Sequence, residues 1–186
     1  MPAIAIEILS VVSNILYLLL LTKKDIRCWA FGIVGSALGV WLMVHATLYG
    51  QALIYTYYVL MGIYGWWHWH SAHETNSITT EWKLRTHTFI LGALTILSIG
   101  MGLLLKQYSN SQYPFADAAL TLFGFGATFM QVRKIRSSWI YWFVIDTAGA
   151  ILYFKTGLQA YALLMAVYAS LCVSGYLQWK KSEMPT

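Results

Sequence analysis

The residues best suited to chemistry lie on one face of a helix expected at residues 138–154. Trp139, Trp142, Asp146, Gly149 and Tyr153 follow one another in steps of three and four, which places them on the same side of a helix. Asp146 lies near the middle of this apolar segment, where a carboxylate is costly and is expected to face a cavity or a partner. Because charge inside a membrane is rare, we favour the interpretation that this stripe lines a path through the bilayer. Packing and interfacial anchoring are the alternative for the aromatics, and Trp139 at the segment's end fits that alternative best.

A second stripe occurs in the helix expected at residues 51–70, and it comprises Gln51, Tyr55, Tyr58, Gly62 and Trp66. Amide groups and aromatic faces suit a heteroaromatic ligand, but they also suit ordinary helix packing, and the sequence favours neither. In the helix expected at 158–179 a similar stripe contains Tyr161, Met165, Tyr168, Cys172 and Tyr176, for which packing is the better interpretation. Asn14 adds a further amide in the first apolar segment.

Other polar residues have simpler explanations. Glu7 and Asp117 lie near the starts of two apolar segments, where a solvated position or a helix N-terminus favours negative charge. The run from His68 to His73 invites a metal interpretation, but its spacing fits no metal motif and its tryptophans are typical of a membrane interface. No motif for nucleotide hydrolysis or metalloprotease chemistry is present. We therefore predict no catalytic residues, no metal and no cofactor.

Composition predicts an all-α integral membrane protein. Of 186 residues, 59% are hydrophobic and 10% are charged, whereas soluble domains carry about a quarter charged residues. Seven apolar segments are each near the ~20 residues that cross a bilayer: 3–22, 28–48, 51–70, 86–105, 115–132, 138–154 and 158–179. We interpret the first as a true span rather than a signal peptide, because its basic residues follow it rather than precede it. Only residues 71–85 form a sizeable loop.

The basic residues predict the orientation of these segments. Ten of them follow the first, third, fifth and seventh segments: Lys23, Lys24, Arg27, Lys83, Arg85, Arg133, Lys134, Arg136, Lys180 and Lys181. Only Lys106 and Lys155 lie on the other side. The positive-inside rule places the ten in the cytoplasm, with the N-terminus outside and the C-terminus inside. The net charge of +5 then reflects topology rather than binding to nucleic acid. Cys28 and Cys172 lie toward the cytoplasmic side, and we expect free thiols.

The chain also contains an internal repeat. A shift of 110 positions places Trp139 on Trp29 and Lys134 on Lys24, and it superposes further Trp, Gly and Tyr residues without a gap. Residues 3–70 and 115–179 are the two repeats, and 86–105 is a connector helix. Because the connector adds a crossing, both repeats have the same orientation, which is a parallel repeat. We expect one transmembrane domain over residues 1–186 with a 3+1+3 arrangement. Duplicated halves in a membrane protein are typical of transporters.

Four segments of the chain resemble the PnuC-type vitamin transporters of bacteria. They are residues 29–33, residues 64–69, Asp117 with Thr121, and the run Trp139-x-x-Trp142-x-x-x-Asp146. Two departures stand out. Ala30 replaces a usual proline, and Tyr55 stands where riboside-type members tend to have a glutamine, with Gln51 one turn earlier.

This resemblance implies a 3+1+3 bundle like that of the SWEET sugar transporters in the opposite orientation, located in the bacterial inner membrane. Relatives carry nicotinamide riboside, thiamine or riboflavin, some are homotrimers, and transport is by facilitated diffusion with trapping by a cytoplasmic kinase. Trp139, Trp142, Asp146 and the polar positions of 51–70 would line the substrate site. The expected function is uptake of a B-vitamin-type solute, with nicotinamide riboside first. Alternatives are thiamine or riboflavin, proton-coupled symport through Asp146 or Glu7, and, more remotely, a membrane-embedded enzyme.

Overall fold

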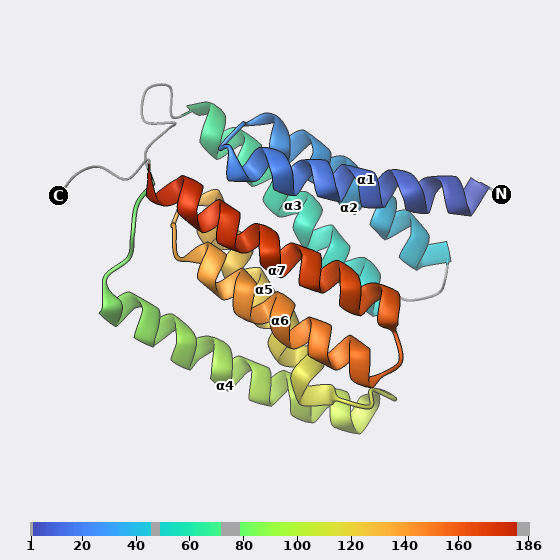
Figure 1. Ribbon diagram of the computed structural model, residues 1–186. Helices are drawn as coiled ribbons and strands as arrows, with labels where there is room; N and C mark the ends of the chain where they lie inside the picture. The colour runs from blue at the N-terminus through green and yellow to red at the C-terminus, as the bar shows by residue number, and fades with distance from the viewer. Residues whose placement is uncertain (1, 46–48, 72–78, 182–186) are drawn as a thin grey trace. The chain divides into compact units, whose positions relative to one another are not determined.

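The computed structural model describes residues 2–45, 49–71 and 79–181 (Figure 1). Within them the chain forms seven helices: α1 Pro2–Thr22, α2 Arg27–His45, α3 Tyr49–Ser71, α4 Leu84–Tyr108, α5 Pro114–Val132, α6 Ser138–Lys155 and α7 Gln159–Lys180. Each lies where an apolar segment predicts it, with ends that differ by no more than three residues. Pro114 begins α5, because a proline at the first helical position sacrifices no intrahelical hydrogen bond.

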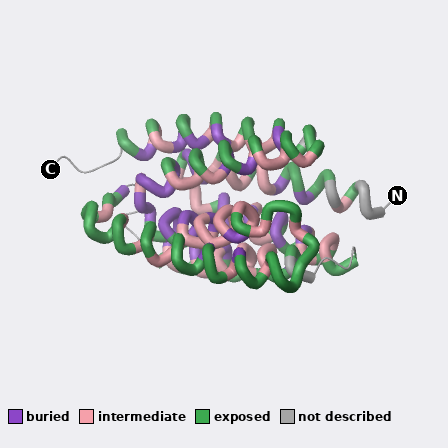
Figure 2. The backbone as a smooth tube through the Cα atoms, turned by 90° about the horizontal axis from the view of Figure 1, so that it is seen from below, coloured by how far each residue is buried: buried purple, intermediate pink, exposed green. Residues whose placement is uncertain are grey.

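Four of these helical stretches are long and apolar enough to cross a membrane. They are α2, α4, α5 and residues Tyr161–Lys180 of α7. The helix α4 is the most apolar of them, and only Ser98 and Gly102 of its residues are buried. Figure 2 shows helices whose exposed residues run along one side and whose buried residues run along the other. Exposed apolar side chains on long helices are what a bilayer requires, so the chain is a multi-pass membrane protein.

The helices form two compact units. The first unit comprises residues 1–79, 132–134 and 177–186, and the second comprises residues 80–131 and 135–176. In the first unit, α1 and α3 both pack against α2, and Figure 1 shows α1 beside α2. Small residues on α2 allow this close approach. The Asn14 side chain lies against Gly35, the Tyr55 ring lies against Gly39, and Ser10 Oγ donates a hydrogen bond of 2.9 Å to the Gly35 carbonyl.

Each unit contains a tryptophan packed flat against a glycine. In the first unit the Trp29 ring from α2 covers Gly65 of α3, and in the second unit the Trp139 ring from α6 covers Gly175 of α7. A Cβ atom on Gly65 would lie 2.5 Å from Trp29, and one on Gly175 would lie 2.6 Å from Trp139. Both indoles are buried, so only glycine fits opposite them.

The turns that end α1 and α5 have the same backbone conformation. Lys24 and Lys134 both have a φ of 55°, in the left-handed region that non-glycine residues seldom adopt. In each turn the next residue's N–H donates to a carbonyl five positions earlier, at 3.1 Å after α1 and 2.9 Å after α5. This hydrogen bond is the Schellman pattern that satisfies the last carbonyls of a helix.

Two buried indoles complete the ends of the same two helices within the first unit. Trp179 Nε1 donates to the Leu21 carbonyl at 3.1 Å, near the end of α1, and Trp69 Nε1 donates to the Val132 carbonyl at 2.8 Å, at the end of α5. The two rings lie 6.4 Å apart between centroids. Lys134 Nζ lies 4.6 Å from the centre of the Trp69 ring, within the range of a cation–π contact.

Candidate functional site

The face of α6 that carries the aromatic and acidic stripe turns inward in the second unit. Trp139, Asp146 and Gly149 are buried, and Trp142 and Tyr153 are half-buried. The opposite face is exposed and apolar, and it comprises Ile140, Phe143, Val144, Ile151 and Phe154. One face of α6 is thus apolar and exposed, as a lipid-facing surface requires, and the Asp146 carboxylate lies on the opposite, buried face.

Asp146 is the buried carboxylate of the described chain. Its side chain is 5% exposed, whereas Asp25, Glu81 and Asp117 are all more accessible. The Cys172 thiol on α7 donates to Asp146 Oδ2 at 3.6 Å between sulfur and oxygen. A thiol is a weak donor and does not neutralise a carboxylate. Asp146 is thus placed to bind a cation or to hold a proton.

The Cys172 thiol also borders an apolar cavity of about 180 Å³ between α6 and α7. The cavity is lined by Trp139, Ile140, Phe143, Cys172, Val173 and Tyr176. Its lining exposes only apolar surface, so this cavity does not suit a polar ligand.

Trp142 supplies a hydrogen-bond donor beside the acid. Its Nε1 atom is buried and has no hydrogen-bond partner among the described residues. A buried donor without a partner costs about 1–3 kcal/mol, and such exceptions are informative because most buried polar atoms are satisfied. The indole N–H one turn before Asp146 can donate to a carbonyl or hydroxyl oxygen of a ligand.

The remaining candidate residues, apart from Tyr153, belong to the first unit. Asn14 and Tyr55 both lie over the glycine face of α2, and Tyr58 contacts Tyr57 with ring centroids 5.6 Å apart. Gln51 and Trp66 are exposed, the latter to 39%. Asn14 and Tyr55 are therefore half-buried against α2, whereas Gln51 and Trp66 lie on the surface of the unit. Tyr153, in the second unit, contacts the Tyr161 ring at 5.7 Å.

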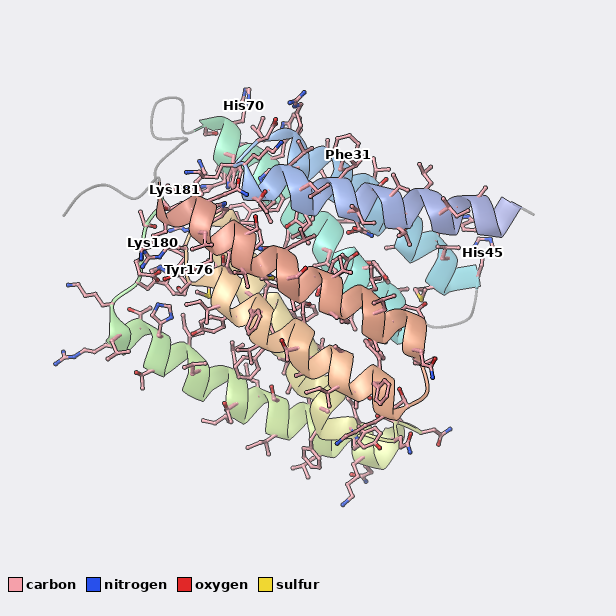
Figure 3. The ribbon with its side chains drawn as sticks, in the orientation of Figure 1. Phe31, His45, His70, Tyr176, Lys180 and Lys181 are labelled. Atoms are coloured by element: carbon pink, nitrogen blue, oxygen red, sulfur yellow. The ribbon has the colours of Figure 1, made fainter. Side chains whose placement is uncertain are left out.

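The other polar residues have local partners. Asp117 lies in the first turn of α5 and accepts a hydrogen bond from Ser111 Oγ, which fits a role at the helix start. His45, labelled in Figure 3, places Nδ1 at 2.9 Å from the Trp41 carbonyl. No group of three His, Cys, Asp or Glu residues among those described could hold a metal ion. The Glu7 side chain and His73 lie outside the described residues.

Two lysines at the helix-ending turns have unusual acid–base properties. Burial, together with the nearby charge of Lys24, lowers the pKa of Lys134 to about 8. Burial also lowers the pKa of Lys24. By contrast, hydrogen bonds from Arg27 lower the pKa of Asp25, since they stabilise its charged form.

Two features of the site were not apparent from sequence. Cys172 lies on the α7 stripe that we interpreted as packing, and only the fold shows its contact with Asp146. Glu81 lies in the loop 71–85 and contacts the start of α6, although no periodicity or motif marks it. The only signal for Cys172 in the sequence was its place on the α7 stripe, one turn from other stripe residues. For Glu81 the sequence contains no signal.

The fold and the inward acid and indoles of α6 define a multi-pass helical membrane protein with a polar site at mid-helix. The chain belongs to the nicotinamide mononucleotide transporter family, whose sequence profile matches residues 4–181. A crystal structure of the vitamin B3 transporter PnuC has the same fold, with a TM-score of 0.73 and 21% identity over 95% of this chain and 80% of that chain. A search of curated proteins finds no significant match. The resemblance to PnuC-type transporters is thus confirmed, and the protein is a transporter rather than an enzyme.

Proposed function

We propose that this protein takes up a B-vitamin-type heteroaromatic solute, with nicotinamide riboside as the first candidate. The observation that carries the proposal is the buried carboxylate of Asp146 on one face of α6 with Trp139 and Trp142. A family of nicotinamide mononucleotide transporters and a fold shared with a vitamin B3 transporter support this class of substrate.

The chemistry of α6 fits a fixed cationic ring. The pyridinium of nicotinamide riboside gains about 0.5–2 kcal/mol from a well-placed indole face such as that of Trp142, and Asp146 compensates its charge without a metal. The Trp142 N–H can donate to the carboxamide oxygen, because its Nε1 has no other partner in the described structure. Asn14, Gln51, Tyr55, Tyr58 and Trp66 of the first unit are our further candidates for substrate binding, and they carry amide, hydroxyl and ring groups.

Thiamine is the second candidate, and riboflavin the third. Thiamine also carries a fixed cationic ring, so Asp146 and the indoles suit it equally well. Tyr55, packed against Gly39, stands where riboside-type relatives tend to have a glutamine, and it offers a phenol in place of an amide. Riboflavin is neutral and would gain from stacking but not from the carboxylate.

The proposed architecture is a single domain of seven spans in a 3+1+3 parallel repeat, with the N-terminus outside the cell and the C-terminus in the cytoplasm. The matched turns at Lys24 and Lys134 support the repeat, and so do the Trp–Gly contacts at Gly65 and Gly175. Alternating access would come from rocking of one repeat against the other. We place the protein in the bacterial inner membrane, as a homotrimer by analogy with relatives.

We propose facilitated diffusion as the mode of transport. A facilitator only equalises concentrations, so accumulation requires a cytoplasmic kinase that converts the solute to a charged phosphate. Proton-coupled symport is the alternative, because a buried carboxylate such as Asp146 can carry a proton across.

The test uses purified protein in liposomes loaded with unlabelled solute. Saturable exchange of labelled nicotinamide riboside, abolished by Asp146→Ala, is the expected result. Exchange of thiamine or riboflavin alone would move the assignment to that vitamin, and exchange of none of the three would reject the function. Uptake that responds to an imposed pH gradient would replace facilitation by symport.

A further inference from the structure

The carboxylate of Glu81 lies at the start of α6, although Glu81 belongs to the segment before α4. Glu81 Oε2 accepts the backbone N–H of Ser137 at 3.1 Å, and Glu81 Oε1 accepts the Ser137 hydroxyl at 2.6 Å. The neighbouring carbonyl of Thr80 accepts the backbone N–H of Arg136 at 3.0 Å. Residues 80 and 81 thus satisfy two successive donors that precede α6.

The backbone N–H groups of Arg136 and Ser137 find their acceptors in residues 80 and 81 rather than in the turn before α6. The following amides are already used, because Ser138 and Trp139 donate to the carbonyls three residues before them, at 3.1 and 3.2 Å. Ser137 makes no side-chain capping bond to α6 itself. A helix start needs external acceptors, and a carboxylate is the strongest because it also complements the helix dipole. Glu81 therefore does what a local capping residue does elsewhere.

The first unit contains the local version of the same arrangement. There the N–H of Arg27 donates to Asp25 Oδ1 at 3.0 Å, two residues away in the same turn. The 110-residue shift that superposes the repeats places Ser137 on Arg27 and Ile135 on Asp25. The equivalent backbone N–H donates to a carboxylate in both turns. The turn before α6 has Ile135 where the first turn has Asp25, and Glu81 supplies the carboxylate there.

Further contacts fix Glu81 in this place. His87 Nε2 lies 3.2 Å from Glu81 Oε1, and His87 Nδ1 lies 3.1 Å from the Tyr141 hydroxyl one turn into α6. Arg136 Nε lies 3.5 Å from Glu81 Oε2, and its guanidinium covers the ring of Tyr176, labelled in Figure 3. The network joins the beginning of α4, the beginning of α6 and the end of α7.

We propose that Glu81 is a positioning residue for substrate binding: from the connector it fixes where α6 begins and so holds Trp142 and Asp146 in register against α7. Asp146 lies two and a half turns after Ser137, and a rotation of the helix start would move it away from Cys172. This role for Glu81 depends on the proposed function in one respect, which is that α6 lines the substrate site.

The test reads the register of α6 without substrate. The sequence holds two cysteines, so Cys28→Ser leaves Cys172 as the single thiol. Cys172 is 2% exposed and touches Asp146, and N-ethylmaleimide should label it slowly. In Glu81→Ala we expect labelling about tenfold faster, the order of effect that a lost helix cap produces. Glu81→Gln should be intermediate, because its amide oxygen still accepts the Ser137 N–H.

Two matched variants complete the design. Ser137→Asp in the Glu81→Ala background supplies a local carboxylate at the start of α6 and should restore slow labelling. Asp25→Ala removes the equivalent cap of the first unit and should leave Cys172 labelling at the wild-type rate. Nicotinamide riboside affinity, measured by tryptophan fluorescence, should weaken about tenfold in Glu81→Ala and recover in the double variant.

Unchanged Cys172 labelling in folded Glu81→Ala would overturn the proposal, as would faster labelling that Ser137→Asp does not reverse. If Glu81→Ala does not fold, Glu81→Gln decides by the same readout. Wild-type protein that binds no vitamin would refute the proposed function alone, because the labelling experiment does not use substrate.

Discussion

Gly175→Ala tests the packing that sets the spacing of α6 and α7. The added Cβ would lie 2.6 Å from two ring carbons of Trp139, whereas carbon atoms in contact prefer about 3.5–4.0 Å. The helices must therefore separate by about 1 Å, because the Trp139 indole is fully buried and cannot move aside. Such overpacking costs about 1–3 kcal/mol. Alanine regains about 0.5–1 kcal/mol of helix propensity, so we expect a net loss of about 1–2 kcal/mol.

Two further variants make the comparison quantitative. Gly65→Ala meets Trp29 at 2.5 Å and should cost as much as Gly175→Ala. Gly100→Ala on α4 has nothing within 4 Å of its new methyl group, so it should stabilise by about 0.5–1 kcal/mol. The measurement is the free energy of unfolding in detergent micelles, from a denaturant titration followed by circular dichroism.

The relative unfolding free energies of the three variants test whether Trp139 packs on Gly175. If Gly175→Ala is as stable as Gly100→Ala, then Trp139 does not pack on Gly175 and the close approach of α6 to α7 is wrong. A loss for Gly65→Ala without one for Gly175→Ala would show that the two Trp–Gly contacts are not equivalent, and it would weaken the proposed repeat.

Three other outcomes follow from the structure. Asp146→Ala or Trp142→Ala should weaken vitamin binding about tenfold or more without unfolding the protein, since each removes one charge or ring contact; wild-type affinity in both, by fluorescence titration, would show that α6 presents the wrong face. Trp179→Phe should cost about 1–2 kcal/mol in the same unfolding assay, because the buried hydrogen bond from the indole is lost and the Leu21 carbonyl keeps only the Lys24 N–H as donor; a stability equal to wild type would contradict that hydrogen bond. Stability should rise with pH between about 8 and about 10.4, because folded Lys134 loses its proton at the lower value and unfolded lysine at the higher; Lys134→Met should flatten this rise, and an equal slope in both would refute the low pKa.

Periodicity and composition predict the helices of this chain well. Runs of about 20 apolar residues can only be helices in a bilayer, because every backbone group must be satisfied within the segment. Basic residues and Pro114 then mark the helix ends, and the ends lie within three residues of those predicted. Spacing in steps of three and four likewise predicts the inward face of α6, on which Asp146 is buried.

Partners from distant parts of the chain could not be predicted in this way. The contact of Asp146 with Cys172 joins two helices, and helical periodicity gives a face but not the neighbour that meets it. Glu81 is still less predictable, because its partner Ser137, at the start of α6, lies 56 residues later in the sequence. The sequence also could not predict which residues of one stripe are buried. Tyr55 packs on Gly39, while Gln51, one turn earlier on the same stripe, is exposed.

The hydrogen bonds of Trp69 and Trp179 have a consequence for assembly. Trp69 comes from the first half of the sequence and completes the last turn of α5 in the second half, while Trp179 from the second half completes α1 in the first. The Leu21 carbonyl also accepts the Lys24 N–H at 3.0 Å, so the indole of Trp179 reinforces this helix end rather than supplying its sole donor. Each half-chain made separately would lack the indole that the other half supplies.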